Sequence, residues 1–445
     1  MLQTILKKPE LTGVSPLSGE HTISERVEGI TRRLRLLGIT PQIWQRSSGF
    51  SAGGVAMRIH VRELANSPGL LAESLENIRV ALAAGVSLNV SLDNLGPGDR
   101  SIEGLQSFCN DVRGILQSSD SRNGELGLCV AASDITLPAF QVISSAVLGY
   151  GHRYVALDAS HMDASAVDRC ANSDWAALFA RSSGPAPLWP VYDAAVRTRC
   201  PLLNNEASDA LLPGSGIAVP AGTAWLPMEF DVSRFADADG VVQTDPLAQA
   251  IDACVELGDE LFSLLSWPGE RQLEDARLNR RLAVMLTGIG DLVLLRGADP
   301  TDLGCLRDLD RLVGHIHNGL WEKTKYLAEV HGPLPALEKQ HPAGRWQDER
   351  HCQDWVLRWQ KAMSTEQVRH RNLLVMSPYS VLPRHTPAHR DFVDLLPLIA
   401  HADALSFAGP PSLQNWTAAD FTVFHRRAWA VIQRRDAASF VAARV

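Results

Sequence analysis

The chain alternates between two hydrophobic periods, one typical of helices and the other of strands. A segment that begins at Ser67 carries apolar residues at helical spacing, with Ser67 in the N-cap position, Pro68 in the first turn and Gly85 at the end. Residues 86–92 follow directly and alternate apolar with polar side chains, as a half-buried strand does. Together they predict a helix followed by a strand.

Further apolar tracts of strand length recur along the chain. They begin at Leu126, Tyr154, Gly216, Asn372 and Ala404. Two amphipathic stretches predict helices, one capped by Asp245 with Pro246 in its first turn, the other spanning Leu306 to Leu320. Strands that alternate with helices favour parallel pairing and an α/β architecture, in which reactive groups usually lie on the loops that follow the strands.

The stretch from Gly214 to Asp231 has the general shape of an active-site strand and loop. It predicts a short apolar strand that passes through a glycine turn into Leu226 and Pro227. It contains no cysteine, histidine or carboxylate before Glu229. Whether this stretch is a reaction centre therefore has to be decided from the rest of the chain.

Composition describes an ordinary globular protein. Of the 445 residues, 45% are hydrophobic and 21% charged, so a large core is expected, and the net charge of -8 argues against general nucleic-acid binding. The seven cysteines show no CxxC spacing, which fits a reducing cytoplasm better than a disulfide framework or a zinc ribbon. The N-terminus lacks the apolar region of a signal peptide, and the apolar run from Leu282 to Leu295 is too short to cross a bilayer. We expect a soluble, cytoplasmic protein that binds no membrane.

Two segments depart from the regular pattern. Residues 330–355 are rich in Pro, His and Trp and predict an insertion, which could be a lid, a partner contact or a plain surface excursion. Residues 421–445 hold five arginines and one aspartate, a local balance of +4, and predict a basic amphipathic helix with Phe424 and Trp429 facing inward. This helix is either a solvated surface element or a contact for an anionic partner.

No familiar motif supplies a metal or cofactor site. His315 and His317 lie two residues apart in a predicted helix, so their side chains point in different directions, and a solvated helix face is favoured over a metal pair. His351 with Cys352, and His385 with His389, have no second pair at a ligand spacing. Cys129 and Cys254 are predicted to be small buried hydrophobic residues. The sequence indicates no metal, and it names no cofactor.

Six segments, taken in order, resemble the barrel domain of the large, catalytic subunit of ribonucleotide reductase. The clearest is residues 277–297, which has the family's Arg-Arg start and glycine-spaced middle. The others are residues 51–64, 123–140, 172–209, 325–335 and 369–383. The resemblance implies a single domain, residues 1–445, with the α/β barrel fold shared by ribonucleotide reductases and pyruvate formate-lyases.

The resemblance also implies which positions would carry the family's radical chemistry. In that family, the segment before a Leu-Pro pair carries the thiyl-radical cysteine and a glutamate base on a loop inside the barrel. When the chain is aligned on Leu226 and Pro227, the asparagine of that motif falls on Val219, the cysteine on Ala221 and the glutamate on Thr223. Alanine cannot hold a thiyl radical, and threonine has no group that titrates near neutral pH.

Three further departures point the same way. The family's reducing cysteine near the start of the chain has no counterpart in residues 13–15, and its phosphate loop aligns with residues 377–381, where Tyr379 and Ser380 replace small residues. The chain also lacks counterparts of the family's N-terminal nucleotide-sensing domain and C-terminal cysteine tail. By the family motif, no catalytic residue remains.

These observations leave three hypotheses. In the first, the chain is a pseudoenzyme of this family that acts as a binding or partner subunit, with another protein or a second copy of itself. In the second, the barrel cavity performs other chemistry on a small molecule, as in a specialised biosynthetic pathway. Its candidate residues are Thr223, Glu229, Ser377, Tyr379 and Ser380. In the third, the resemblance is of fold only; residues 377–381 are then an ordinary turn.

Overall fold

The computed structural model describes chiefly residues 22–118, 126–131, 153–158, 188–191, 210–338 and 368–376, with short gaps inside these ranges. A mixed sheet organises this part of the chain. Its main strands are β4 (Gly54–His60), β5 (Ser87–Asp93), β6 (Leu126–Ala131), β7 (Arg153–Asp158), β8 (Leu188–Val191), β11 (Ala224–Asp231), β12 (Leu282–Thr287) and β13 (Leu374–Met376).

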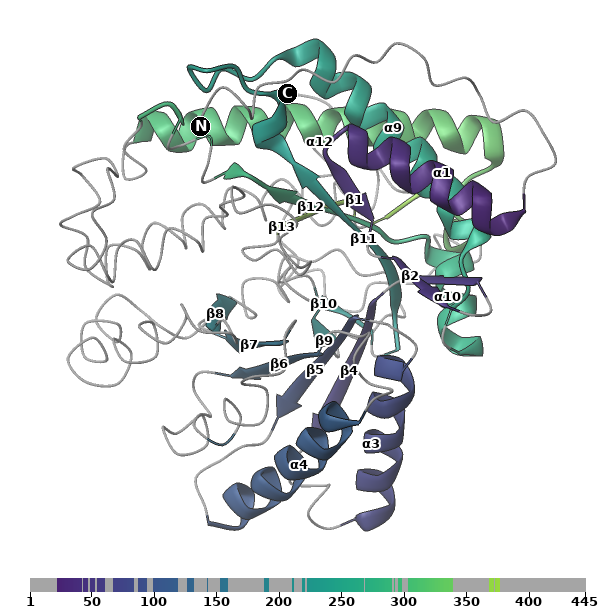
Figure 1. The fold of residues 1–445 in the computed structure, drawn as a ribbon, viewed down its shortest axis with the longest axis vertical. Helices are drawn as coiled ribbons and strands as arrows, with labels where there is room; N and C mark the ends of the chain where they lie inside the picture. The colour runs from purple at the N-terminus through teal and green to yellow at the C-terminus, as the bar shows by residue number, and fades with distance from the viewer. Residues whose placement is uncertain are drawn as a thin grey trace, which may run out of the picture.

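The sheet consists of two parallel blocks. The strand order is β13-β12-β11-β4-β5-β6-β7-β8 (Figure 1). β4 to β8 run parallel to one another, and β11 to β13 form a second parallel set. The blocks meet in a short antiparallel ladder between β11 and β4.

β11 is the strand on which the two blocks depend. Along one edge, residues 226–231 pair with β12. Along the other edge its partner changes: residues 224–225 pair with β4, and residues 228–230 pair antiparallel with β1 (Ile39–Pro41). β11 is therefore a fork, with β4 and β1 sharing one of its edges.

Pro227 lies at the branch point of this fork, in neither the β4 ladder nor the β1 ladder. Amides along a strand point alternately to its two edges: Leu226 N–H donates to the Arg281 carbonyl on the β12 side, and Asp231 N–H donates to the Gly38 carbonyl on the β1 side. The nitrogen of Pro227 faces that second edge. Since no ladder bond is required there, a proline is accommodated inside a central strand.

Three helices cover one face of β11 and β12. They are α1 (Ile23–Leu36), α9 (Thr244–Leu264) and α12 (Leu303–His331), which lie together in the upper part of Figure 1. α1 begins at a capping box in which Thr22 Oγ1 accepts from Glu25 N–H at 3.3 Å. Alternate residues of β11, namely Leu226, Met228 and Phe230, are fully buried in the hydrophobic core beneath these helices.

The remaining elements surround this framework. α3 (Pro68–Ala83) packs against β5 and against α4 (Asp99–Gln117), while β9 (Ala210–Leu211), paired with β10 (Ala218–Val219), lies against β4 and β5 (Figure 1). α10 (Glu270–Asn279) packs against α13 (Pro335–Glu338). A hairpin of β2 (Ile43–Arg46) and β3 (Gly49–Ala52) and the short 3-10 helix η4 (Val232–Phe235) complete the set.

Several predicted elements are confirmed. The predicted helix at Ser67 is α3, the strands predicted at residue 86 and at Leu126, Tyr154 and Asn372 are β5, β6, β7 and β13, and the stretch from Leu306 lies in α12. The α/β barrel, formed as one domain over residues 1–445, stays a prediction. β8 and β13 are the two ends of the described strand order, and the described residues do not show whether the sheet closes into a barrel.

Two details differ from the prediction. In the 214–231 stretch, the short strand β10 and the glycine turn at Gly222 precede Leu226 and Pro227 as predicted, but these two residues lie inside a second strand, β11, which was not predicted. Asp245 does not cap its helix: Gln243 occupies the N-cap position of α9, and Asp245 lies in the first turn, where its charge is favourable toward the helix dipole.

The two irregular segments are described only in part. Val330 and His331 end α12, Leu334 is buried and its N–H donates to the Val368 carbonyl at 2.7 Å, and α13 follows. Residues 339–355 of the predicted insertion lie outside the described residues, as do the strand predicted at Ala404 and the helix predicted over 421–445. Within the described part of the chain, none of the helices combines the length and the apolar character needed to span a bilayer.

The turn after β12 gives a test of the contact between β11 and β12. Gly288 has φ +76°, and a Cβ there would lie 2.3 Å from Asp231 Oδ1 at the end of β11. We expect Gly288→Ala to lower the free energy of unfolding by about 2 kcal/mol or more, because it adds a contact and backbone strain together. Urea unfolding followed by circular dichroism would measure this.

Gly114→Ala is the matched control. Gly114 lies within α4, and no atom lies within 4 Å of the position that a Cβ would take there. Alanine at this position should therefore raise stability by roughly 0.5–1 kcal/mol. If both variants shift equally, β11 and β12 do not approach each other at Gly288 as described.

Candidate functional site

Thr223, a candidate residue from the sequence analysis, has a structural role. It immediately precedes β11 and is only 2% exposed. Its hydroxyl donates to the Pro220 carbonyl at 2.6 Å, and its N–H donates to the same oxygen at 3.3 Å. The next amide, of Ala224, donates to Asp275 Oδ2 at 2.9 Å. These bonds fix the turn that leads into β11, and they occupy the hydroxyl proton of Thr223.

Glu229 lies on the face of β11 opposite the hydrophobic core. It is half-buried, and its register partners are Thr40 of β1 and Met285 of β12. By strand alternation, Trp225 shares this face, whereas Met228 faces the core. Met228 therefore packs against the helices and does not share the face of β11 that carries Trp225 and Glu229.

Two polar residues that the sequence analysis did not select lie beside Glu229, at the C-terminal ends of β11 and β12. Asp231 and Thr287 are register partners in adjacent parallel strands, so their side chains emerge on the same face. Asp231 Oδ1 accepts from Ser233 Oγ at 2.6 Å. Thr287 is 1% exposed, and its hydroxyl has no hydrogen-bond partner among the described residues.

The other predicted candidates are not brought into this group. Ala221, Ser377, Tyr379 and Ser380 lie outside the described residues. Thr223 and Glu229 lie at opposite ends of β11, because one precedes the strand and the other is near its end. Glu229, Asp231 and Thr287 therefore form the polar group that the described part of the chain places at the C-terminal strand ends.

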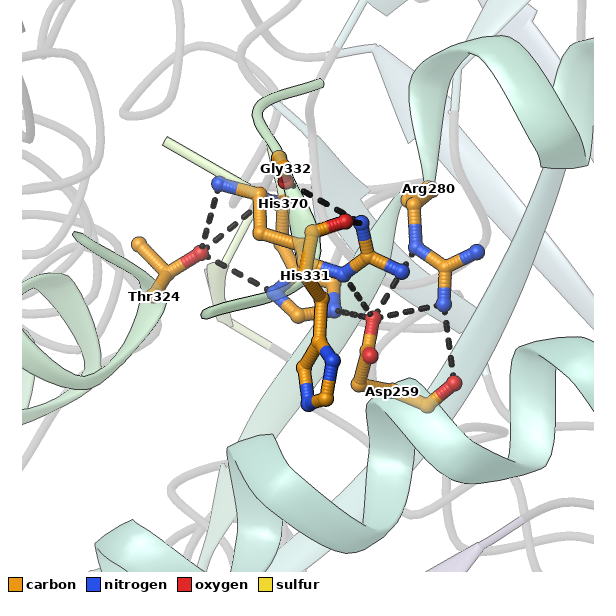
Figure 2. Close-up of polar contacts among 7 residues, drawn as sticks. Asp259, Arg280, Thr324, His331, Gly332 and His370 are labelled. Carbon is orange, nitrogen blue, oxygen red and sulfur yellow. Dashed lines mark hydrogen bonds and ion pairs between the residues drawn. The ribbon is translucent and has the colours of Figure 1, made fainter. Parts of the chain in front are cut away.

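A second polar group is the most extensive buried ionic network among the described residues, and Asp259 of α9 is its centre. Its Oδ1 accepts from four donors: Arg280 Nε at 3.0 Å, Arg280 Nη2 at 2.5 Å, Arg369 Nε at 2.9 Å and His370 Nε2 at 2.9 Å (Figure 2). The side chains of Asp259, Arg280 and Arg369 are only 9–15% exposed. We call these four residues the Asp259 network.

Backbone contacts hold each arginine in place. Arg280 Nη2 also donates to the Asp259 carbonyl at 2.8 Å, and Arg369 Nη1 donates to the carbonyls of His331 and Gly332 at 2.9 and 3.1 Å. The guanidinium of Arg280 lies over the ring of Phe262, 5.1 Å from its centroid. The network thus joins α9, the segment before β12, the end of α12 and the segment before β13.

His370 and Thr324 extend the network, and their geometry defines the tautomer. The ionised carboxylate of Asp259 can only accept, so Nε2 of His370 carries the proton. Thr324 Oγ1 accepts the backbone N–H groups of His370 and Arg369 at 2.9 and 3.2 Å, and its own proton is left to donate to His370 Nδ1 at 2.9 Å. A neutral imidazole satisfies every one of these bonds.

This Asp-His-Thr series has the order of a nucleophilic triad, but it is built as a buried structural unit. His370 and Thr324 are both 0% exposed. The hydroxyl oxygen of Thr324 already accepts hydrogen bonds from two backbone amides. These bonds reduce its nucleophilicity and hold it against the segment before β13. The burial and hydrogen bonds of His370 and Thr324 therefore indicate a structural role and not a nucleophilic one.

The pKa values of the network follow from these contacts. Burial alone would raise the pKa of Asp259, but the His370 hydrogen bond and the charges of Arg280 and Arg369 outweigh it and hold that pKa well below its usual range. Burial lowers the pKa of His370, and the two arginines add to this while Asp259 opposes it. Burial also lowers the pKa of Arg280.

The residues considered for metals and thiol chemistry are separated or inert. In α12, His315 is exposed and His317 is buried, so the two side chains point apart as predicted, although His317 is not on a solvated face. Burial raises the pKa of Cys254, and it raises that of Cys109 to about 12, so neither thiol ionises near neutral pH. Among the described residues, no three His, Cys, Asp or Glu side chains form a metal cluster.

The sequence contained partial signals for the Asp259 network. Arg280 belongs to the Arg-Arg start of the 277–297 segment, and Arg369 and His370 open the 369–383 segment, so two segments singled out in the sequence meet in space at Asp259. Asp259 itself sits on the buried face of α9, where a carboxylate requires cationic partners.

Comparison of the chain with protein-family models gave no matching family, and comparison with curated proteins gave no match.

Replacing the central carboxylate should be costly. We expect Asp259→Asn to lower the free energy of unfolding by about 3–5 kcal/mol, because it leaves two largely buried guanidinium groups without their anion. The neighbouring Glu260→Gln, which breaks the exposed pair with Arg26, should cost about 0–1 kcal/mol. Denaturant unfolding of the two variants compares adjacent positions of one helix. Equal losses would contradict the buried network.

The neutral state of His370 predicts a pH dependence. Because its folded pKa is lowered, the unfolded chain binds the proton first as pH falls, so stability is unaffected above the ordinary histidine pKa and declines from about pH 6.5 downward. Replacing His370 with Gln should flatten the decline between about pH 6.5 and 5. Thermal unfolding of both proteins across that range measures the difference, and parallel curves would rule out His370 as its source.

Proposed function

We propose that the chain is a ribonucleotide-reductase-like barrel protein that has lost thiyl-radical chemistry and acts as a binding or partner subunit of a complex. The observation that carries this proposal is the burial and hydrogen bonding of Thr223. The position that the family uses for its base holds a buried hydroxyl, which is bonded to the Pro220 carbonyl in a turn.

The surroundings of Thr223 support the same conclusion. Asp275 of α10 accepts the Ala224 amide, and Arg271 lies against Gly222, where a Cβ would come within 2.8 Å of its Nε. Gly222 has φ +80°. This turn is closely packed and is fixed by hydrogen bonds to the backbone, so it can hold the start of β11 in place. A reaction centre on it would need a group that titrates or that forms a radical.

A second candidate function is catalysis of a different kind in the same fold. It is favoured by the polar group at the C-terminal ends of β11 and β12, where Glu229, Asp231 and Thr287 share one face. Carboxylates and a hydroxyl at such strand ends would suit a small molecule that carries hydroxyl or amino groups. In this function Glu229, which is half-buried, would be the acid or base.

The first function is tested by recovery of the protein from its native cell after mild crosslinking, with mass analysis of what stays bound. A protein recovered in fixed ratio supports it, and charge reversal at Arg426 and Arg427 of the basic segment should then reduce that ratio. Arg311→Glu, at a side chain of α12 that is 80% exposed, is the matched control. Deoxynucleotide formation by the purified chain with a radical-generating partner would overturn the proposal.

Recovery of a small molecule without a partner protein would favour the second function. In that case Glu229→Gln and Thr287→Val should each reduce retention of the molecule, whereas the Arg426 and Arg427 variants should retain it. Unchanged retention in both strand variants would remove the polar group from consideration.

A further inference from the structure

Residues 368–371, which precede β13, bond to four parts of the chain that are distant from one another in sequence. At one end, the Val368 carbonyl accepts from the N–H of Leu334, in the connection between α12 and α13, at 2.7 Å. At the other end, Arg371 Nη1 donates to Asn279 Oδ1 of α10 at 2.8 Å. We call residues 368–371 the clasp, because they tie the start of β13 to these helices.

The middle of the clasp bonds to α12 and α9. Thr324 of α12 accepts the backbone N–H groups of Arg369 and His370, and Asp259 of α9 accepts from both side chains (Figure 2). Val368 is the one apolar residue of the clasp, so hydrogen bonds and ion pairs make up most of its contacts. A segment with few buried apolar contacts opens at a lower free energy than core strands do.

His370 makes the clasp sensitive to acid. It is 0% exposed, its Nε2 donates to Asp259, and its Nδ1 accepts from Thr324. A proton on Nδ1 would face Thr324 Oγ1, whose two lone pairs already accept two backbone amides. The charged groups that face the ring are Asp259 of α9, Arg280 at the end of α10 and Arg369 of the clasp, while α12 contributes the uncharged Thr324. Protonation would therefore place a third positive charge beside a single carboxylate.

We propose that the clasp is an acid-sensitive switch: it opens separately from the rest of the fold, and protonation of His370 in the open state keeps it open. Opening releases both the start of β13 and the connection between α12 and α13. Ser377, a candidate residue of the sequence analysis, follows β13 directly in the chain, so opening also frees the point at which that segment begins. The switch does not depend on either proposed function.

Hydrogen exchange of the whole chain at pH 7.5 and pH 5.5, corrected for intrinsic exchange rates, tests the separate opening. At both pH values, peptides from residues 331–336 and 368–376 should exchange faster than peptides from β11. Their opening constant should rise about tenfold at pH 5.5, because the open state binds a proton at a histidine of ordinary pKa, about 6.5, and burial lowers the pKa of His370 in the closed state.

Two results of this experiment would contradict the switch. Exchange of the clasp peptides at the rate of β11 would mean that the clasp opens only when the whole protein unfolds. An opening constant that is the same at both pH values would mean that no group in the clasp gains a proton on opening.

His370→Gln tests the assignment to the histidine. A glutamine amide can still donate to Asp259 but does not titrate, so the opening constant should be about the same at the two pH values. A rise that persists in this variant would rule out His370 as its source. His370→Asn, which does not titrate either, replaces it if the glutamine variant does not fold.

His331→Gln is the matched control. His331 lies at the end of α12 with an exposed side chain, and it contacts Arg369 only through its backbone carbonyl among the printed bonds of the clasp. This variant should keep the full rise of about tenfold. Loss of the rise here would assign the pH dependence to an exposed histidine and overturn the proposal.

Discussion

The described structure depends most on one carboxylate oxygen. Asp259 Oδ1 gathers donors from Arg280, Arg369 and His370, and these residues come from segments that are distant in sequence. Arg280 stands just before β12, and residues 369–370 stand just before β13. The carboxylate thus fixes where two neighbouring parallel strands begin relative to α9. An apolar contact could not do this, because it has no preferred direction, whereas a shared oxygen sets both the distance and the angle of each donor.

The same design distinguishes the two ends of the β11–β13 block. At the N-terminal ends of these strands, the polar groups of Thr223, Asp275 and the Asp259 network take part in hydrogen bonds that hold the fold together. At the C-terminal ends, Thr287 has a buried hydroxyl beside Asp231 that none of the described residues bonds. Thr223 therefore belongs to the supporting end of the block, whereas the hydroxyl of Thr287, which has no partner among the described residues, lies at the opposite end.

The sequence allowed the regular elements to be predicted where a single period dominates. The helix from Ser67 and the strands at Leu126 and Tyr154 were correct because their apolar spacing agrees with their capping or turn residues. β11 was not predicted as a separate strand after the glycine turn, and the pairing that accommodates Pro227 inside it depends on two partners that sequence spacing cannot show. Asp259 was missed for a related reason: a lone acidic residue in a helix is usually solvated, and only the tertiary approach of Arg280 and Arg369 reveals its burial. Glu229 was selected by residue type, while its neighbours Asp231 and Thr287 became apparent only from strand register.

The branch point at Pro227 also bears on how the chain reaches this structure. The ladder between β4 and β11 joins Val55 to Ala224, so a long loop must close before it can form, and contacts of that range slow folding. Until β4 and β1 arrive, the edge of β11 is exposed in an apolar strand, which is the kind of surface that pairs between molecules. A proline in the middle of that edge interrupts the row of N–H donors that an intermolecular strand would need. Pro227 therefore removes a donor that intermolecular strand pairing would use, at a place where the finished protein requires no ladder bond.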